Sequence, residues 1–369
     1  MQKLDKLLNL KITIDGNNTV KVFENCNLNS QFVSISLPIG GLSFINQRGE
    51  RIPSGVAHLI EHLLLDDMNN LFEKYMIKGA KVNGYTHLNT TTFNIIMSDF
   101  NASIIDEFLD DLFNKKITNE SFSKQKKIVL NEFHTTNTVG SKYERGLRKL
   151  FGPIYPYFTV IGNEDDIKGI ELYELLSFKE EYFIIENIDF ITCGPARSSN
   201  VFKWAEKLNK RKDKGLFVPK DISFNEDDIR FIREDNTLFS LLDNDSIEHL
   251  ITTETIINII GTVLIEKGII SNYQIDIIGS KLLCILDFKK LPHNGLTISY
   301  KEFKQIKIRI VYSFLMSFNY TERFVDRVHW IYLNNYNLSE YYQALNTISY
   351  NALLEYLKRL QSIVEQEMG

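Results

Sequence analysis

Cysteine is scarce in this sequence, and the few that occur form no pattern. Cys26, Cys193 and Cys284 are odd in number, far apart and outside any Cys-x-x-Cys spacing. Disulfide frameworks and cysteine-ligated zinc sites need paired or closely spaced cysteines. The sequence therefore predicts small buried thiols in a reducing compartment.

Long apolar runs and an excess of positive charge are also missing. No run of about 18 uncharged apolar residues occurs, and the first residues carry charges where a signal peptide would be apolar. We therefore expect no membrane span and a cytoplasmic location. The formal net charge is −5, with both signs mixed along the chain, so we expect no nucleic-acid partner.

The spacing of apolar residues predicts an α+β protein of two domains. The 369 residues suffice for two hydrophobic cores. Segments such as residues 21–40 alternate like strands, whereas residues 54–66 have helical spacing. We expect two similar domains, each a mostly antiparallel β-sheet with helices packed on one face, at residues 1–205 and 221–369. Charge, glycine and proline cluster in residues 206–220, the expected linker.

The stretch SGVAHLIEHLLLDD holds two histidines four positions apart, and Ser54 is its expected N-cap. Positions i and i+4 of a helix share a face, so His58 and His62 can bind one ion, as in half of a zinc site. Glu61 flanks that face and can deprotonate a zinc-bound water, whose pKa the metal lowers to about 7. The order His-x-x-Glu-His is the inverzincin signature.

A complete catalytic zinc site needs a third protein ligand. Glu132 lies seventy positions after His62, on an amphipathic helix whose apolar face includes Ile128 and Val129. His87 and His134 are competing candidates, which the ligand spacing favours less. The alternative for the whole motif is a core helix whose histidines and glutamate point to solvent or pair with each other.

Four collinear stretches resemble the insulinase/pitrilysin-type metallopeptidases, a family that includes the mitochondrial processing peptidase. They are GVAHLIEHLLLDD, FEKYMIKGAKVNGYTHLNTTTFNI, KQKKIVLNEF and GPIYPYFTVIGNEDDIKGIELYELLSFKEEYFIIENIDFITCG. The resemblance covers roughly residues 1–200 and continues more weakly to the C-terminus. It implies that His58, His62 and Glu132 bind Zn²⁺ and that Glu61 is the general base. The first domain is then catalytic, and the second lacks a metal motif.

The same resemblance implies a substrate site beside the metal. The segment VNGYT matches an Asn-Ala-Tyr-Thr-like segment of the family. By this match Asn83, Tyr85 and Thr86 bind the peptide substrate, and the following strand pairs with it as an added edge strand. A further match, which covers Tyr155-Pro156-Tyr157 and Gly162 to Ile167, implies a structural role.

Two positions depart from the family pattern. Gln125 stands where many members carry a glutamate seven positions before the ligand glutamate, so it can support the site only as a neutral hydrogen-bonding group. The C-terminal half of the family supplies an Arg–Tyr pair to the substrate, but here Tyr273 has no matching arginine. The chain is also shorter than typical two-domain members. We therefore expect a homodimer, or a heterodimer with a related subunit.

These observations lead to one hypothesis and one alternative. The hypothesis is a zinc-dependent endopeptidase that cleaves small unfolded peptides in an enclosed chamber, in peptide maturation or degradation. The alternative is a non-catalytic scaffold or peptide-binding subunit of the same fold. The presence of all four proposed metal and base residues favours the enzyme.

Overall fold

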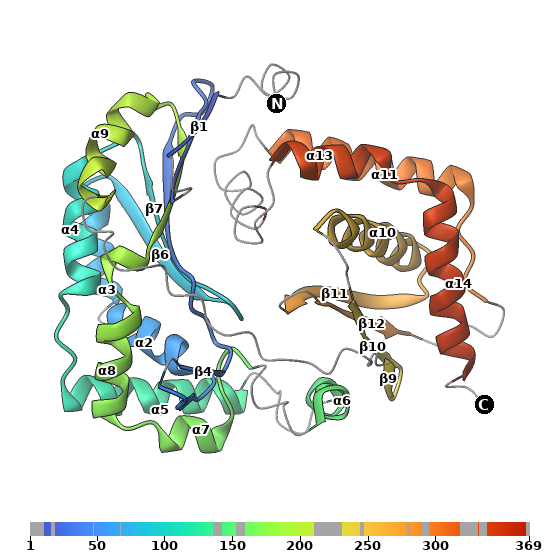
Figure 1. Ribbon diagram of the computed structural model, residues 1–369, viewed down its shortest axis with the longest axis horizontal. Helices are drawn as coiled ribbons and strands as arrows, with labels where there is room; N and C mark the ends of the chain where they lie inside the picture. Colours follow the sequence, from blue (N-terminus) through green and yellow to red (C-terminus); the bar gives the residue numbers. More distant parts are fainter. Residues whose placement is uncertain are drawn as a thin grey trace. The chain divides into compact units, whose positions relative to one another are not determined.

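The computed structural model describes residues 11–15, 19–46, 48–66, 68–135, 142–152, 159–209, 231–243, 247–278, 281–289, 295–317, 331 and 338–366. The chain divides into two compact units (Figure 1). Unit 1 comprises Met1–Asn137, Pro156–Ile222 and Ser317–His329, and unit 2 comprises Thr138–Tyr155, Ser223–Met316 and Trp330–Gly369. Each unit combines a largely antiparallel sheet with helices, so the expected α+β class is confirmed.

The sheet of unit 1 has six strands. Their order is β1 (Lys11–Ile14), β2 (Val20–Glu24), β8 (Asp189–Gly194), β3 (Gln31–Leu37), β7 (Thr91–Met97) and β6 (Ala80–Thr86). Only β2 and β8 pair in parallel; the other neighbours are antiparallel. Every residue of the central strand β3 is buried. Within the described part of the chain, β6 pairs on one side only and is therefore an edge strand.

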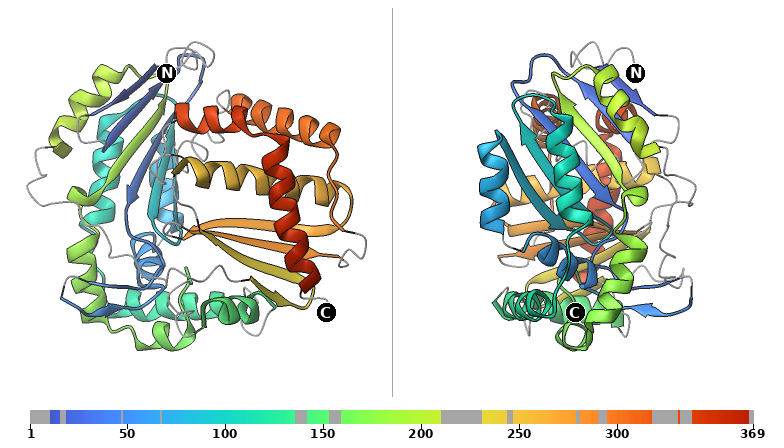
Figure 2. Two further views of the ribbon diagram at one scale, coloured as in Figure 1. Left: turned by 45° about the vertical axis from the view of Figure 1, so that its right-hand side comes forward. Right: turned by 90° about the vertical axis from the view of Figure 1, so that its left-hand side faces the viewer.

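Helices cover one face of this sheet (Figures 1 and 2). They are α2 (Val56–Leu64), α3 (Met68–Ile77), α4 (Ala102–Phe113), α8 (Leu172–Tyr182) and α9 (Ser198–Asn209). Two further helices, α5 (Asn119–Thr135) and α7 (Glu164–Gly169), contact each other, and α5 also contacts α2. The small elements β4 (Phe44–Ile45), β5 (Arg51–Ile52) and η2 (Ile185–Asn187) complete the described part of the unit.

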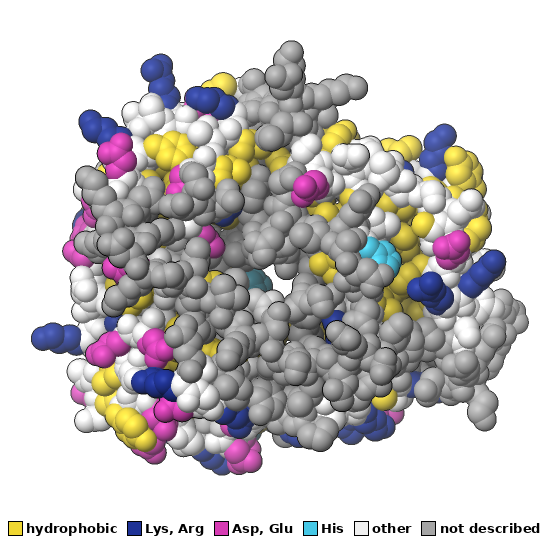
Figure 3. Space-filling model, in the orientation of Figure 1, with side chains coloured by type: hydrophobic (Ala, Val, Ile, Leu, Met, Phe, Trp, Pro, Cys, Tyr) yellow, Lys and Arg dark blue, Asp and Glu magenta, His cyan; other side chains and the backbone are white. Residues whose placement is uncertain are grey.

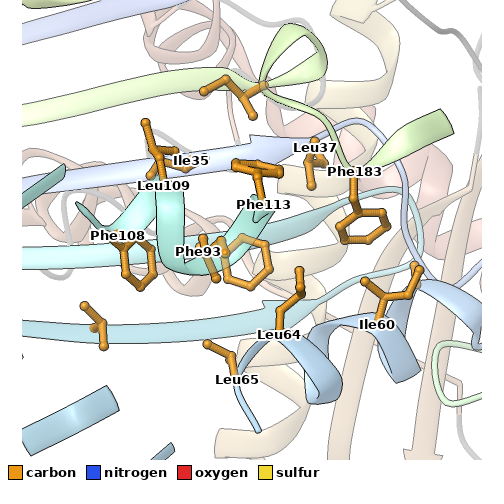
Figure 4. Packing of buried hydrophobic residues seen from close by; sticks show 14 of the residues in the cluster. Ile35, Leu37, Ile60, Leu64, Leu65, Phe93, Phe108, Leu109, Phe113 and Phe183 are labelled. Carbon is orange, nitrogen blue, oxygen red and sulfur yellow. The ribbon is translucent and has the colours of Figure 1, made fainter. Parts of the chain in front are cut away.

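The core of unit 1 lies between the sheet and these helices (Figure 4). Helix α4 begins after Asn101, whose side chain accepts hydrogen bonds from the backbone N–H groups of Ser103 and Ile104. The apolar stripe predicted for this helix is buried: Ile104, Ile105, Phe108, Leu109 and Leu112. It meets Ile35 and Leu37 of β3, Phe93 of β7, and Ile60 and Leu64 of α2 in one cluster.

Unit 2 has an antiparallel sheet of four strands, in the order β11 (Ile270–Ile278), β12 (Lys281–Phe288), β10 (Thr237–Asp243) and β9 (Phe231–Glu234). Its helices are α6 (Lys142–Phe151), α10 (Ile247–Glu266), α11 (Tyr300–Ser317), α13 (Leu338–Thr347) and α14 (Tyr350–Gln366). The helix α10 is long and apolar enough to span a membrane, but 67% of that stretch is buried inside the protein. Core helices of soluble proteins pass the same test of length and composition.

The helix α6 packs on the sheet of unit 2, although its residues lie within the range 1–205 expected for the first domain. Arg145 and Lys149 both pair with Glu234 on β9. Gly146 allows the close contact, because a Cβ there would lie 2.2 Å from the ring of Phe239. The expected linker, residues 206–220, lies outside the described residues from 210 onward, and so do Tyr155-Pro156-Tyr157.

Charged side chains of both signs are interspersed on the face shown in Figure 3. Neighbouring charges pair in many places, as in Arg51–Asp166 at 2.8 Å and Lys74–Glu107 at 2.9 Å. On this face the described residues follow the mixed charge pattern of the sequence.

Candidate metal centre

Helix α2 begins where two glycine backbones meet. The N-cap is Gly55, with a left-handed φ of 85° and no side-chain cap, so the expectation that Ser54 caps the helix is wrong. Ser54 instead donates its hydroxyl to Asp166 at 3.2 Å. A Cβ on Gly55 would lie 2.2 Å from the carbonyl oxygen of Ile161, and a Cβ on Gly162 would lie 2.7 Å from the carbonyl oxygen of Ser54. The segment around Gly162 therefore has the structural role that the resemblance implied.

The polar residues of α2 are buried together with its apolar ones. Leu59 and Ile60 are completely buried, and His58 and Glu61 are only 7% and 8% exposed. The alternative in which these polar side chains point to solvent is therefore wrong. A buried imidazole and a buried carboxylate are costly unless they bind something.

Glu132 of α5 meets both histidines. Its Oε2 lies 3.4 Å from Nε2 of His62 and 3.9 Å from Nε2 of His58. The two rings are 4.6 Å apart at an interplanar angle of 77°. One ligand atom from each of the three side chains lies within 4.8 Å of the others, and this is the one such metal-binding group found among the described residues.

The chemistry of the three donors fits zinc. Burial and the neighbouring His62 lower the pKa of His58 to about 4, which keeps the imidazole in the neutral form that binds metal. Its buried Nδ1 has no hydrogen-bond partner, and its Nε2 faces Glu132 beyond hydrogen-bonding distance. The protein alone thus leaves this ring unsatisfied. Two imidazoles and one carboxylate, with room for a fourth ligand, are a usual donor set of catalytic zinc sites.

A residue of the edge strand β6 orients the side chain of Glu61. Thr86, at the end of β6, donates its hydroxyl to Oε2 of Glu61 at 3.0 Å. Burial raises the pKa of Glu61, and Glu132 adds to this, whereas the hydrogen bond from Thr86 and the charge of His62 oppose it. The other carboxylate oxygen has no hydrogen bond to any described residue. The sequence assigned Thr86 to the substrate and missed this contact.

The remaining substrate candidates of unit 1 lie on β6 itself. Val82 is buried and Asn83 is exposed, and among the described strands β6 lies at the edge of the sheet. The sequence led us to expect the following strand, β7, at the edge, but β7 lies between β3 and β6. Tyr85 is half-buried, and its ring lies 4.9 Å from the ring of His87. Substrate contacts of Asn83 and Tyr85 stay predictions.

Gln125 lies two turns before Glu132 on α5. It is 6% exposed, and its amide donates to Oδ1 of Asp66 at 2.6 Å. It has no hydrogen bond to His58, His62 or Glu132, so any support it gives the ligands is indirect. Val129 is fully buried as expected, whereas Ile128 is 39% exposed and does not belong to the apolar face.

The other candidate residues lie apart from the metal group. His134 is exposed and faces Glu164 of α7 at 3.6 Å, and the exposed His87 also stays outside the group. Tyr273 of unit 2 donates its hydroxyl to Asn258 of α10 at 3.2 Å, and its ring packs where a Cβ on Gly261 would lie. A substrate contact of Tyr273 stays a prediction.

Comparison with known sequences gives one curated relative, and no family model matches the chain. The relative is the zinc protease PqqE of Helicobacter pylori, 27% identical over 164 residues. The match covers 42% of this chain and 37% of the relative. The chain therefore aligns with little more than a third of the length of that protein.

Solved structures share the fold over nearly the whole chain. A protease from Helicobacter pylori matches with a TM-score of 0.72 and 16% identity, over 95% of this chain and 96% of its own. An inactive domain of an M16 peptidase from Pseudomonas fluorescens matches with a TM-score of 0.68 and 15% identity, over 95% of both chains. The chain therefore has the fold of M16-like peptidases, and part of it is similar in sequence to a zinc protease, in agreement with the resemblance of its motifs to the insulinase/pitrilysin-type metallopeptidases.

Proposed function

We propose that the chain is a zinc-dependent endopeptidase that cleaves small unfolded peptides. The observation that carries this proposal is the convergence of His58, His62 and Glu132 beside the buried carboxylate of Glu61. The similarity to a zinc protease supports the choice of metal. His58, His62 and Glu132 would hold the ion and leave one position open.

The residues around the ion suit peptide hydrolysis. When bound, zinc supplies a Lewis acid that activates water and polarises the scissile carbonyl. Glu61 accepts a proton from the attacking water on its free oxygen and donates it to the leaving amine nitrogen. Thr86 fixes the orientation of Glu61 by its hydrogen bond to Oε2. Burial favours the protonated carboxyl that must exist between the two transfers.

The edge strand β6 gives the peptide a place to bind. An extended peptide can pair with the free backbone groups of an edge strand. Thr86 ends this strand and contacts Glu61, so a peptide paired with β6 would pass beside the base. An enclosed chamber, a dimeric or heterodimeric assembly and a role in peptide maturation or degradation belong to the proposal on the strength of the family resemblance alone.

The proposal is tested by cleavage of a pool of unstructured peptides, followed by mass spectrometry. We expect Glu61→Gln to retain the zinc content of the wild type and to lower the cleavage rate about 10³-fold, a typical contribution of a general base. The matched control is Glu180→Gln, because Glu180 is an exposed glutamate on α8. We expect this variant to cleave the peptides at the wild-type rate. Cleavage by Glu61→Gln at the wild-type rate would refute the proposed base.

The second candidate function is a peptide-binding subunit that does not cleave. It is favoured by one observation, namely that an inactive M16 domain has the same fold. Such a subunit would bind the peptides of the pool and release them intact, even with zinc bound. The cleavage experiment with the zinc-loaded wild type separates the two functions.

A further inference from the structure

The three metal ligands come from two helices, and the helix that carries Glu132 has few buried residues. Helix α2 is buried along nearly its whole length. Helix α5 has 17 residues, but its buried ones are only Phe122, Gln125 and Val129. Leu130 and Phe133 add partly buried contacts. Ligands must be held within a fraction of an ångström, so with few apolar contacts the polar contacts of α5 have a large share in restraining it. One of them is Lys126, which donates to the carbonyl oxygens of Lys168 and Ile170 at 2.8 and 2.7 Å.

A polar contact joins the same two helices close to the ligands. Asp66, just after the end of α2, accepts hydrogen bonds on Oδ1 from Gln125 at 2.6 Å and from Lys124 at 2.9 Å. The side chain of Asp66 is 13% exposed and that of Lys124 is 60% exposed. Burial alone would raise the pKa of Asp66, but the hydrogen bonds from Lys124 and Gln125 outweigh it and lower the pKa. The buried part of this contact is therefore the bond from Gln125 to a charged carboxylate.

The spacing along both helices relates this contact to the metal group. Gln125 lies seven residues before Glu132, which is about two turns and ~10 Å along α5, on the same face. Asp66 follows His62 by four residues and lies just beyond Leu64, the last residue of α2. The pairs Gln125–Asp66 and Glu132–His62 thus connect the two helices at successive levels on one side. The hydrogen bond between Gln125 and Asp66 therefore restrains the rotation and register of α5 at the level of Glu132 and His62.

The backbone at Asp66 is itself held by hydrogen bonds from Lys115. Lys115 donates to the carbonyl oxygens of Leu64 at 3.2 Å and of Asp66 at 2.5 Å. These carbonyls lie at the end of α2, where the helix leaves them without internal partners. The carboxylate that receives Gln125 is therefore presented from a fixed backbone.

We propose that Asp66 is a positioning residue for the metal centre, which acts through Gln125 to set the register of α5 and to hold Glu132 opposite His62. This inference rests on the proposed zinc function. The proposal assigns Gln125 a hydrogen-bond partner, Asp66, that the sequence did not reveal. Removing a group that is bonded directly to a metal ligand typically weakens metal binding by 10- to 100-fold. Because Asp66 and Gln125 act one step further from the ion, we expect the lower end of that range.

The test measures the zinc affinity of the full chain by competition with a chelator of known affinity. We expect Asp66→Ala and Gln125→Met to bind zinc about 10-fold more weakly than the wild type. Methionine keeps the volume of Gln125 and removes the donor. The absorption spectrum of bound Co²⁺ should change in both variants, because it reports the geometry of the ligands.

Two controls separate positioning from general stability. Asp111 accepts hydrogen bonds from Lys74 and Tyr75, both at 2.6 Å, and so joins α3 to α4 without contacting α5. We expect Asp111→Ala to lower stability in urea and to leave the zinc affinity within about twofold of the wild type. The exchange Asp66→Asn with Gln125→Glu keeps a hydrogen bond between the two positions and should recover the affinity to within about threefold.

The outcomes are distinct. Wild-type zinc affinity in Asp66→Ala and Gln125→Met would overturn the positioning role and leave the proposed function intact. An equal loss in Asp111→Ala would also overturn it, because the effect would then be a loss of stability. A wild-type chain that binds no zinc would overturn the proposed function, and the inference with it.

Discussion

Helices α2 and α10 both pack against the sheet of their own unit, and both carry buried polar side chains, but the surroundings of those side chains differ. On α10, Glu254 accepts a hydrogen bond on Oε1 from Asn258 of the same helix, and Asn258 in turn accepts one from Tyr273. On α2, the ring of His58 has no hydrogen bond to the protein and faces Glu132 of another helix, and Glu61 has one donor, Thr86. Buried atoms without a hydrogen bond occur on both helices, but only on α2 do they lie beside a group of residues that could bind a metal, among the described residues.

The largest expected effect is the loss of a ligand from α2. We expect His62→Ala to lose its zinc and to cleave peptides at no measurable rate, because two protein ligands do not hold the ion in a catalytic site. The control is His134→Ala on α5, an exposed histidine that faces Glu164. Elemental analysis and the peptide-pool assay measure both variants. Full zinc content in His62→Ala would show that α2 does not supply the metal ligands, and the contrast between α2 and α10 would be lost.

The next effect concerns the position of α2 itself. Gly55→Ala places a Cβ 2.2 Å from a backbone oxygen at a φ of 85°, so we expect the free energy of unfolding to fall by about 3 kcal/mol. Gly49 has a similar φ of 81° with nothing within 4 Å. Gly49→Ala is therefore the matched control and should cost about 1 kcal/mol. Equal losses in urea denaturation would show that the contact with Ile161 does not hold α2.

The unsatisfied ring of His58 predicts a pH dependence for the metal-free protein. Its pKa is about 4 in the folded chain and about 6.5 when unfolded. The unfolded chain therefore binds the proton first as the pH falls, and stability is lost between about pH 6.5 and 4, by about 3 kcal/mol in total. Urea denaturation after removal of metal measures this loss, and His58→Asn should reduce it. An unchanged profile in His58→Asn would show that the ring is not desolvated.

A smaller effect is expected at Thr86. The Thr86→Val variant keeps the shape of the side chain and removes the donor to Glu61. We expect kcat to fall about 10-fold with KM and zinc content nearly unchanged, because the hydrogen bond orients the base. A rise in KM with unchanged kcat would instead favour the substrate-binding role that the sequence implied.

The smallest effect is expected on α10. The variant Glu254→Gln retains an acceptor for Asn258, and we expect zinc affinity and cleavage within about twofold of the wild type. A large loss of cleavage without loss of stability would show that the buried polar groups of α10 also serve the reaction.

The local spacing of residues predicted the half of the site that lies on α2 and little of the rest. His58 and His62 share a helix face by geometry alone, whereas Glu132 was one of several candidates for the third ligand until the family resemblance assigned it. Thr86 and Asp66 contact residues 25 and 59 positions away, and no local pattern marks them. Such contacts depend on how the helices pack.

Two other errors have the same origin. Ser54 is a good N-cap by residue type, but the contact of Gly55 with Ile161 and Gly162 sets the backbone there. The edge position of β6 was missed because strand order depends on pairing between distant segments. The α+β class was predictable because it needs only the periodicity of the apolar residues.

The central claim is that His58, His62 and Glu132 together hold one zinc ion. The most direct test is the metal content of the purified full chain, by elemental analysis, for the wild type and for Glu132→Ala. We expect about one zinc per chain in the wild type, and a zinc that a chelator removes far more readily from the variant. A wild type without zinc, or a variant that keeps it as firmly, would contradict the account.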